Sequence, residues 1–140
     1  MTHAELVRQQ LRADAAKIGV TEDFISDMVF AFYAKVRGHP VLGPVFDSAI
    51  GENWDAHLDT MTRFWCSVAL NAGTYGGKPV AVHMANPAIQ PQHFGVWLGL
   101  FQATLDEMAP TPAATAYMMG RAERIAANLT RAVHNREQAA

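Results

Sequence analysis

The chain has 140 residues, half of them hydrophobic, which corresponds to one domain that buries roughly two thirds of the surface of its unfolded form. Its 11 basic and 13 acidic residues give a formal net charge of −2 without long runs, which argues against nucleic acid or an anionic membrane as a partner. No stretch approaches the ~18 consecutive apolar residues of a membrane span, and the polar N-terminus does not resemble a secretory signal. A single cysteine, Cys66, cannot form an internal disulfide, so we expect a soluble, cytoplasmic protein.

The first helix is predicted to begin at a capping box, Thr2 with Glu5 three residues later, and to end at Gly19. Its apolar residues recur at helical spacing: Ala4, Val7, Leu11, Ala15 and Ile18. We expect residues 1–19 to be a scaffolding helix that precedes the core.

A second helix is predicted to begin at Thr21 and to end at Gly38 and Pro40. Its buried stripe consists of Ile25, Met28, Val29, Phe32 and Val36. Tyr33 lies at the rim of this stripe, so its hydroxyl either points inward or meets water. The following segment, 39–51, contains two prolines and two glycines, which predict short turns with Phe46 as the one large anchor.

A third helix is predicted from roughly Asn53 to Ala69. One face carries Trp54, Leu58, Met61, Trp65 and Val68 at offsets of four and three residues. His57 shares this face with Phe64, where a histidine is more often a packed core residue than a ligand. The alternative, that His57 is a ligand, becomes a stronger hypothesis only if a second histidine is available.

That second histidine is His83, on a short apolar segment between Pro79 and Pro87 that follows a glycine-rich loop. Held this way, a histidine is either buried packing or a metal ligand. The sequence alone leaves both interpretations open.

Two further helices are predicted after this segment, one from Pro91 to about Met108 and one that begins at Thr111 and Pro112. The buried face of the first consists of Phe94, Trp97, Leu98, Phe101, Leu105 and Met108. That of the second consists of Met118, Ala122, Ile125, Leu129 and Val133. With no strand alternation or interdomain linker, we expect an all-α domain of five main helices and a short one.

The inner faces of these helices are rich in aromatic and polarizable groups that suit a slot for a planar aromatic ligand. These groups are Phe32, Phe46, Met61, Phe64, Phe94 and Trp97, with polar atoms on Tyr33, His57, His83 and Trp97. An ordinary core explains the same residues. No carboxylate recurs at a ligand spacing beside the histidines and no second cysteine is present, so haem is a better use of two histidines than a bare metal ion. Cys66, in the middle of a helix next to Trp65, is interpreted as an inert thiol.

Several separated motifs together resemble the truncated haemoglobins, and within them the third group. The motifs are Phe32 to Arg37, Leu42 to Phe46, Trp54 to His57, Phe64-Trp65, Tyr75 and Pro79 ahead of His83, Phe94, Trp97-Leu98 and Leu100-Phe101. The resemblance covers residues 24–133 in order and spacing, and leaves the N-terminal helix outside. It implies one globin domain over residues 1–140, folded as a two-over-two helical sandwich around a b-type haem (iron protoporphyrin IX).

The resemblance also implies roles for individual residues. His83 corresponds to the proximal iron ligand, and His57 to the distal histidine. Tyr33 and Trp97 correspond to residues that donate hydrogen bonds to a bound ligand such as O2, NO or CO, with Met61 beside them. The remaining haem contacts are expected from Phe32, Phe46, Met61, Phe64, Phe94 and Trp97, with Lys78 and Arg63 as candidates for the propionates.

Hydrogen bonds to partly charged dioxygen are worth roughly 1 to 3 kcal/mol each, so two donors would slow oxygen release about 100-fold or more. We therefore expect chemistry on nitric oxide or peroxide, with a reductase as partner, more than oxygen transport. Two alternatives stay open. One is a six-coordinate haem protein for electron transfer or sensing, in which His57 also binds iron; the other is a haem-free helical interaction module.

Overall fold

The structure, a computed structural model, describes residues 1–73 and 76–139, with side chains as far as residue 136. Within these residues the chain forms only helices: α1 His3–Lys17, α2 Glu22–Gly38, α3 Leu42–Ile50, α4 Trp54–Leu70, α5 Pro79–Ala85, α6 His93–Met108 and α7 Pro112–Ala139. The all-α prediction is confirmed. Tyr75, which belongs to the resemblance described above, lies outside the described residues. None of the described helices is both long and apolar enough to cross a membrane.

Three helices begin where capping chemistry predicts. The Thr2 and Glu5 pair forms the expected capping box at α1. The side-chain oxygens of Thr21 and Thr111 accept hydrogen bonds from backbone N–H groups in the first turns of α2 and α7. Gly19 ends α1 with a φ of +93°, a conformation that glycine adopts without strain.

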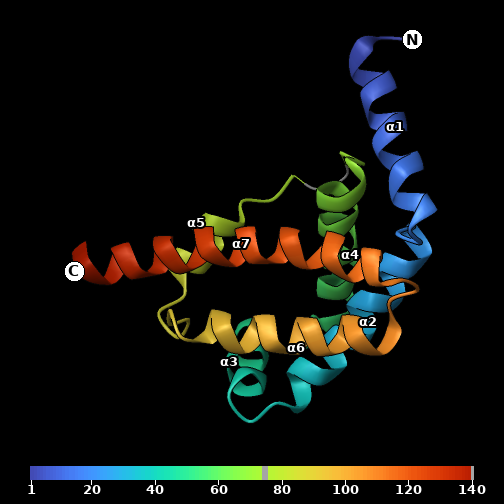
Figure 1. Cartoon of the computed structure of the whole chain (residues 1–140). Helices are drawn as coiled ribbons and strands as arrows, with labels where there is room; N and C mark the ends of the chain where they lie inside the picture. Colours follow the sequence, from blue (N-terminus) through green and yellow to red (C-terminus); the bar gives the residue numbers. More distant parts are fainter. Residues whose placement is uncertain (74–75, 140) are drawn as a thin grey trace.

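Two pairs of helices build the body of the molecule (Figure 1). α6 and α7 lie side by side, α2 packs against α4, and α2 also contacts α6, so the two pairs cross. The predicted stripe of α2 is buried at their meeting point, against Trp65, Phe101 and Met118. α1 projects from this body, and only Ala15 of its predicted face is buried; Val7 is 51% exposed.

The prediction of turns over residues 39–51 was wrong, because residues Leu42–Ile50 form α3. Pro44 lies in the first turn of α3, where a missing amide hydrogen removes no intrahelical bond. Ahead of it, Nδ1 of His39 accepts hydrogen bonds from the backbone N–H groups of Val41 and Leu42, at 3.1 and 3.3 Å. The N-cap residue Val41 makes no side-chain bond of its own, so the His39 side chain provides the acceptor for these two N–H groups at the start of α3.

Gly43 allows α3 to dock closely against the end of α2. A Cβ atom on Gly43 would lie 2.7 Å from the backbone oxygen of Arg37, well inside van der Waals contact. Because the clashing atom belongs to the backbone, a side chain cannot simply rotate away. The position of α3, and of Phe46 on it, therefore depends on a residue without a side chain.

We expect Gly43→Ala to lower the free energy of unfolding by about 1 to 3 kcal/mol, because the added methyl group forces α3 away from α2. Gly99→Ala is the matched control. A Cβ on Gly99 in α6 meets nothing within 4 Å, so helix propensity should raise stability by up to about 1 kcal/mol. Chemical denaturation of both variants measures this, and a neutral or stabilising Gly43→Ala would contradict the close approach.

Candidate functional site

A cavity of about 360 Å³ lies between the two helix pairs, within the size range of small-molecule sites. One side, called here the α4 wall, consists of Tyr33, Phe46, His57, Thr60, Met61, Phe64 and Trp65 from α2, α3 and α4. A second set of lining residues, called here the α5 wall, comes from α5, α6, α7 and the loop after α5 and includes Val82, His83, Asn86, Ile89, Phe94, Trp97, Ile125 and Leu129. A second, smaller apolar cluster of Phe94, Ala126, Leu129 and Val133 packs apart from the main core beside the α5 wall.

His83 lies on α5 with its ring in the cavity wall, 6.0 Å from the Phe94 ring centroid. Its Nδ1 lies 2.6 Å from the carbonyl oxygen of Pro79, one turn earlier in the same helix. A carbonyl oxygen only accepts hydrogen bonds, so Nδ1 must carry the proton and donate it. In the neutral imidazole, Nε2 then holds an unshared electron pair, which is the form that binds a metal ion.

His57 borders the cavity from α4, inside a cage of three aromatic rings. Its ring centroid is 5.1 Å from that of Tyr33, 5.7 Å from Trp54 and 6.5 Å from Phe46. Burial lowers the pKa of His57 below its ordinary value of 6.5, so the imidazole is neutral at pH 7. Within the described residues its Nε2 atom is buried and has no hydrogen-bond partner. A buried polar atom without a partner is costly, which indicates a ligand beside it.

Tyr33 and Trp97 bring further polar groups to the cavity. The Tyr33 side chain is 4% exposed, and burial raises the pKa of its phenol well above the usual value, so its O–H stays available as a donor. The Trp97 ring stacks on Trp65 and Phe101 at centroid distances of 6.3 and 5.4 Å. These contacts hold the indole at the boundary between the core and the cavity.

The other residues predicted to contact a cofactor divide into two sets. Phe46, Met61, Phe64 and Phe94 all border the cavity, so the structure brings them together with the two histidines. Phe32 lies behind the wall, 1% exposed, with its edge against Trp97 and Phe101. Lys78 is exposed at the start of α5 and is not among the described residues that border the cavity.

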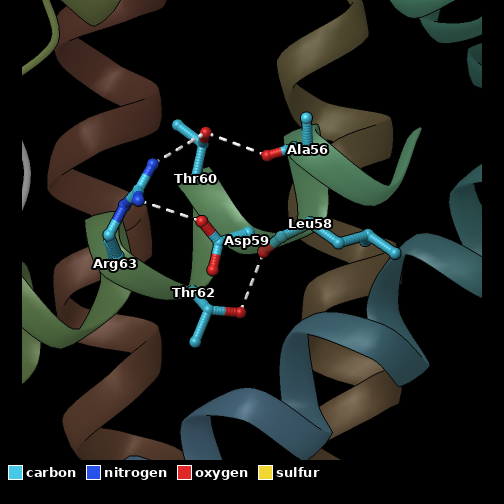
Figure 2. Close-up of polar contacts among 6 residues, drawn as sticks. All are labelled: Ala56, Leu58, Asp59, Thr60, Thr62 and Arg63. Carbon is cyan, nitrogen blue, oxygen red and sulfur yellow. Dashed lines mark hydrogen bonds and ion pairs between the residues drawn. The ribbon is translucent and has the colours of Figure 1, made fainter. Parts of the chain in front are cut away.

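Arg63, the other candidate for an anionic group, takes part in a polar network along α4 (Figure 2). Its guanidinium forms an ion pair with Asp59 at 2.9 Å and donates to the Thr60 hydroxyl at 3.3 Å. Thr60 in turn donates to the carbonyl oxygen of Ala56. An anion at this position would therefore compete with Asp59 for the charge of Arg63.

Sequence reasoning missed two residues near the α5 wall. His93 borders the cavity, and its Nδ1 accepts the backbone N–H of Gln90 at 3.0 Å, which leaves Nε2–H as a donor. Its place just before the aromatic face of α6 was a signal that could have been used. Arg136 near the end of α7 donates to four backbone oxygens around α5, and nothing in the local sequence indicates this.

These features together fit a planar aromatic group with a metal at its centre. The cavity is lined mainly by apolar and aromatic side chains, with one imidazole lone pair on the α5 wall and an unpartnered imidazole nitrogen on the α4 wall. Among the described residues no group of three or more His, Cys, Asp or Glu side chains could hold a bare metal ion. Cys66 is buried, and burial and Glu22 raise the pKa of its thiol, which fits an inert side chain.

Comparison with known proteins identified relatives with the same architecture. A group 3 truncated haemoglobin of Campylobacter jejuni is 34% identical over 90 residues, which cover 62% of this chain and 71% of the relative. A group 2 truncated haemoglobin of Bacillus subtilis is 25% identical over 122 residues, covering 86% of this chain and 90% of the relative. The crystal structure of the group III truncated haemoglobin of Campylobacter jejuni superposes with a TM-score of 0.77 at 30% identity, covering 81% of this chain and 91% of that one. No family model matches the chain.

We expect the stability of the cofactor-free protein to depend on pH through His57. Below 6.5, the ordinary pKa, the unfolded chain binds a proton at His57 that the folded chain does not, so the free energy of unfolding falls as the pH drops. The variant His57→Gln lacks this group and should lose less stability than the wild type between about pH 7.5 and about pH 5. Denaturant titrations at both pH values test this, and equal losses would contradict a buried, neutral imidazole.

Proposed function

The chain belongs to the truncated haemoglobins, in their third group, and from this premise we propose that it binds a b-type haem in the cavity with His83 as the iron ligand. The observation that carries the proposal is the hydrogen bond from Nδ1–H of His83 to the Pro79 carbonyl. This bond fixes the tautomer, orients the ring and makes Nε2 more basic. Phe46, Phe64 and Phe94 would pack against the macrocycle, and residues 1–140 would form one globin domain with α1 as an N-terminal addition.

When bound, haem iron supplies one open position for a diatomic ligand such as O2, NO or CO, and exchanges electrons with it. The chain's own contribution comes from side chains of both walls. The O–H of Tyr33 and the N–H of Trp97 would donate to a ligand that carries negative charge, while Met61 and Phe64 keep the space dry. Neutral His57 adds either a donor or an acceptor, according to its tautomer.

These donors favour retention of the ligand over its release. Each charge-assisted hydrogen bond contributes about 1.5 to 3 kcal/mol, and each ~1.4 kcal/mol is a factor of ten in a rate or equilibrium constant. A protein that releases oxygen slowly is poorly suited to its delivery. We therefore propose chemistry on nitric oxide or peroxide as the function, with a cytoplasmic reductase that returns the iron to its ferrous state.

A six-coordinate protein for electron transfer or sensing is the second candidate, and the unpartnered Nε2 of His57 favours it. In this case His57 would bind the iron from the α4 wall when no external ligand is present. The ferric absorption spectrum at neutral pH distinguishes the two: a low-spin spectrum that becomes high-spin in His57→Leu supports the second candidate. A high-spin wild-type spectrum supports the first.

We expect His83→Ala to abolish the optical bands of the haem complex or to weaken haemin binding at least tenfold. The reason is that the other α5-wall residues named above offer no imidazole nitrogen to the iron. His134→Ala, an exposed histidine of α7, is the control and should bind like the wild type. Titration with haemin followed by absorption measures both. If His83→Ala bound haemin with unchanged affinity and bands, or if the wild type bound none, the haem assignment would be wrong and a haem-free interaction module would be the better description.

We expect Tyr33→Phe and Trp97→Phe each to speed oxygen dissociation by about tenfold or more, since each removes one donor from the ligand. Tyr117→Phe is the matched control: its hydroxyl donates to the carbonyl of Ala69, so this variant should lose stability and keep its off-rate. Stopped-flow measurement of oxygen release tests the set. Rates equal to that of the wild type in both pocket variants would contradict retention by hydrogen bonding.

A further inference from the structure

α5 carries His83 but has little packing of its own to hold it in place. It is seven residues long, and none of its residues is buried; Val82 is 63% exposed and Met84 is 40% exposed. A helix this short is unstable in isolation, and its final carbonyl groups have no partner within the helix. Something outside α5 must therefore fix its position.

α5 lies beside α7 (Figure 1), and Arg136 on α7 fixes its position. Its Nη1 donates to the carbonyl oxygens of His83, Met84 and Asn86 at 3.3, 3.1 and 3.0 Å. Its Nη2 donates to that of Ile89 at 2.9 Å. One guanidinium thus ties the end of α5 and the loop that follows it to α7.

Both the charge and the geometry of the Arg136 guanidinium suit a position at the C-terminal end of α5. The C-terminal end of a helix carries partial negative charge, and a cation there is favourable. The planar fork of a guanidinium also holds several acceptors at fixed directions, which the single ammonium of a lysine does not. Two of the four acceptors lie in α5 itself, and one is the carbonyl of His83.

These bonds link the His83 ring to the body of the protein in two steps. Nδ1–H holds the ring to the Pro79 carbonyl within α5, and Arg136 holds α5 to α7. We propose that Arg136 is a positioning residue that sets the distance and tilt of Nε2 of His83 toward the iron, and so the strength of that bond and the residence time of the haem. This inference rests on the proposed function.

The test compares Arg136→Met, Arg136→Lys and the control Arg131→Met in the haem-loaded protein. Arg131 lies on the same helix and is exposed, and its guanidinium donates to the side-chain oxygen of Asn128 at 3.5 Å. Resonance Raman spectroscopy of the ferrous protein measures the iron–histidine stretching band, and transfer of haem to a scavenging apoprotein measures the dissociation rate. Thermal unfolding of each variant reports the purely structural effect.

We expect Arg136→Met to shift and broaden the iron–histidine band and to release haem at least tenfold faster. Arg136→Lys, which keeps the charge but reaches fewer carbonyls, should lie between it and the wild type, and Arg131→Met should match the wild type. An unchanged band in Arg136→Met, even with a lower melting temperature, would overturn the positioning role. If Arg136→Met does not fold, the band of Arg136→Lys decides in the same way. A wild type that takes up no haemin would instead overturn the proposed function itself.

Discussion

The hydrogen bond between Nδ1 of His83 and the carbonyl of Pro79 determines which ring nitrogen carries the proton and which keeps an unshared electron pair. Without it both tautomers of the imidazole would be available, and the ring could rotate on a helix that buries none of its residues. With it, an unshared electron pair is presented by the α5 wall toward an apolar space. The chemistry of the site thus depends on one backbone acceptor. This acceptor is the carbonyl oxygen of Pro79, which lies in the first turn of α5, one turn before His83.

The two walls of the cavity are built in different ways. On the α4 wall, the indole N–H of Trp54 donates to Asp47 of α3 at 3.1 Å, and the Arg37 guanidinium lies 4.4 Å from the Trp54 ring centroid. These contacts lock α2, α3 and α4 together around His57, so the polar groups there are held by packing. On the α5 wall, the residues of α6 and α7 are also packed, but α5 itself buries none of its residues, and its end is held by hydrogen bonds from one side chain, Arg136.

Much of this fold is visible in the sequence, because capping residues and apolar periodicity are local signals. The starts of α1, α2 and α7 and the buried stripe of α2 follow from them. α3 was not predicted from the sequence, because its proline and glycine were interpreted as helix breakers. The features that permit a helix there are hydrogen bonds to the His39 side chain and the close approach of Gly43 to the backbone of α2, and neither is a usual sequence signal. For the site, periodicity predicted that His57 faces inward, but it could not predict that Phe32 lies behind the wall. Arg136 is beyond sequence reasoning, since its acceptors lie 47 to 53 residues away.

Because α5 buries none of its residues, the cofactor-free protein should have two different opening free energies: one for global unfolding and a smaller one for local opening of α5. Amides in the centre of α2 should exchange with deuterium only through global unfolding, whereas those of α5 should exchange through a smaller, cheaper opening. A cofactor that binds only the closed form raises the smaller of these free energies by mass action. Loading would then complete the folding of one wall, and the apoprotein would be the species most exposed to proteases.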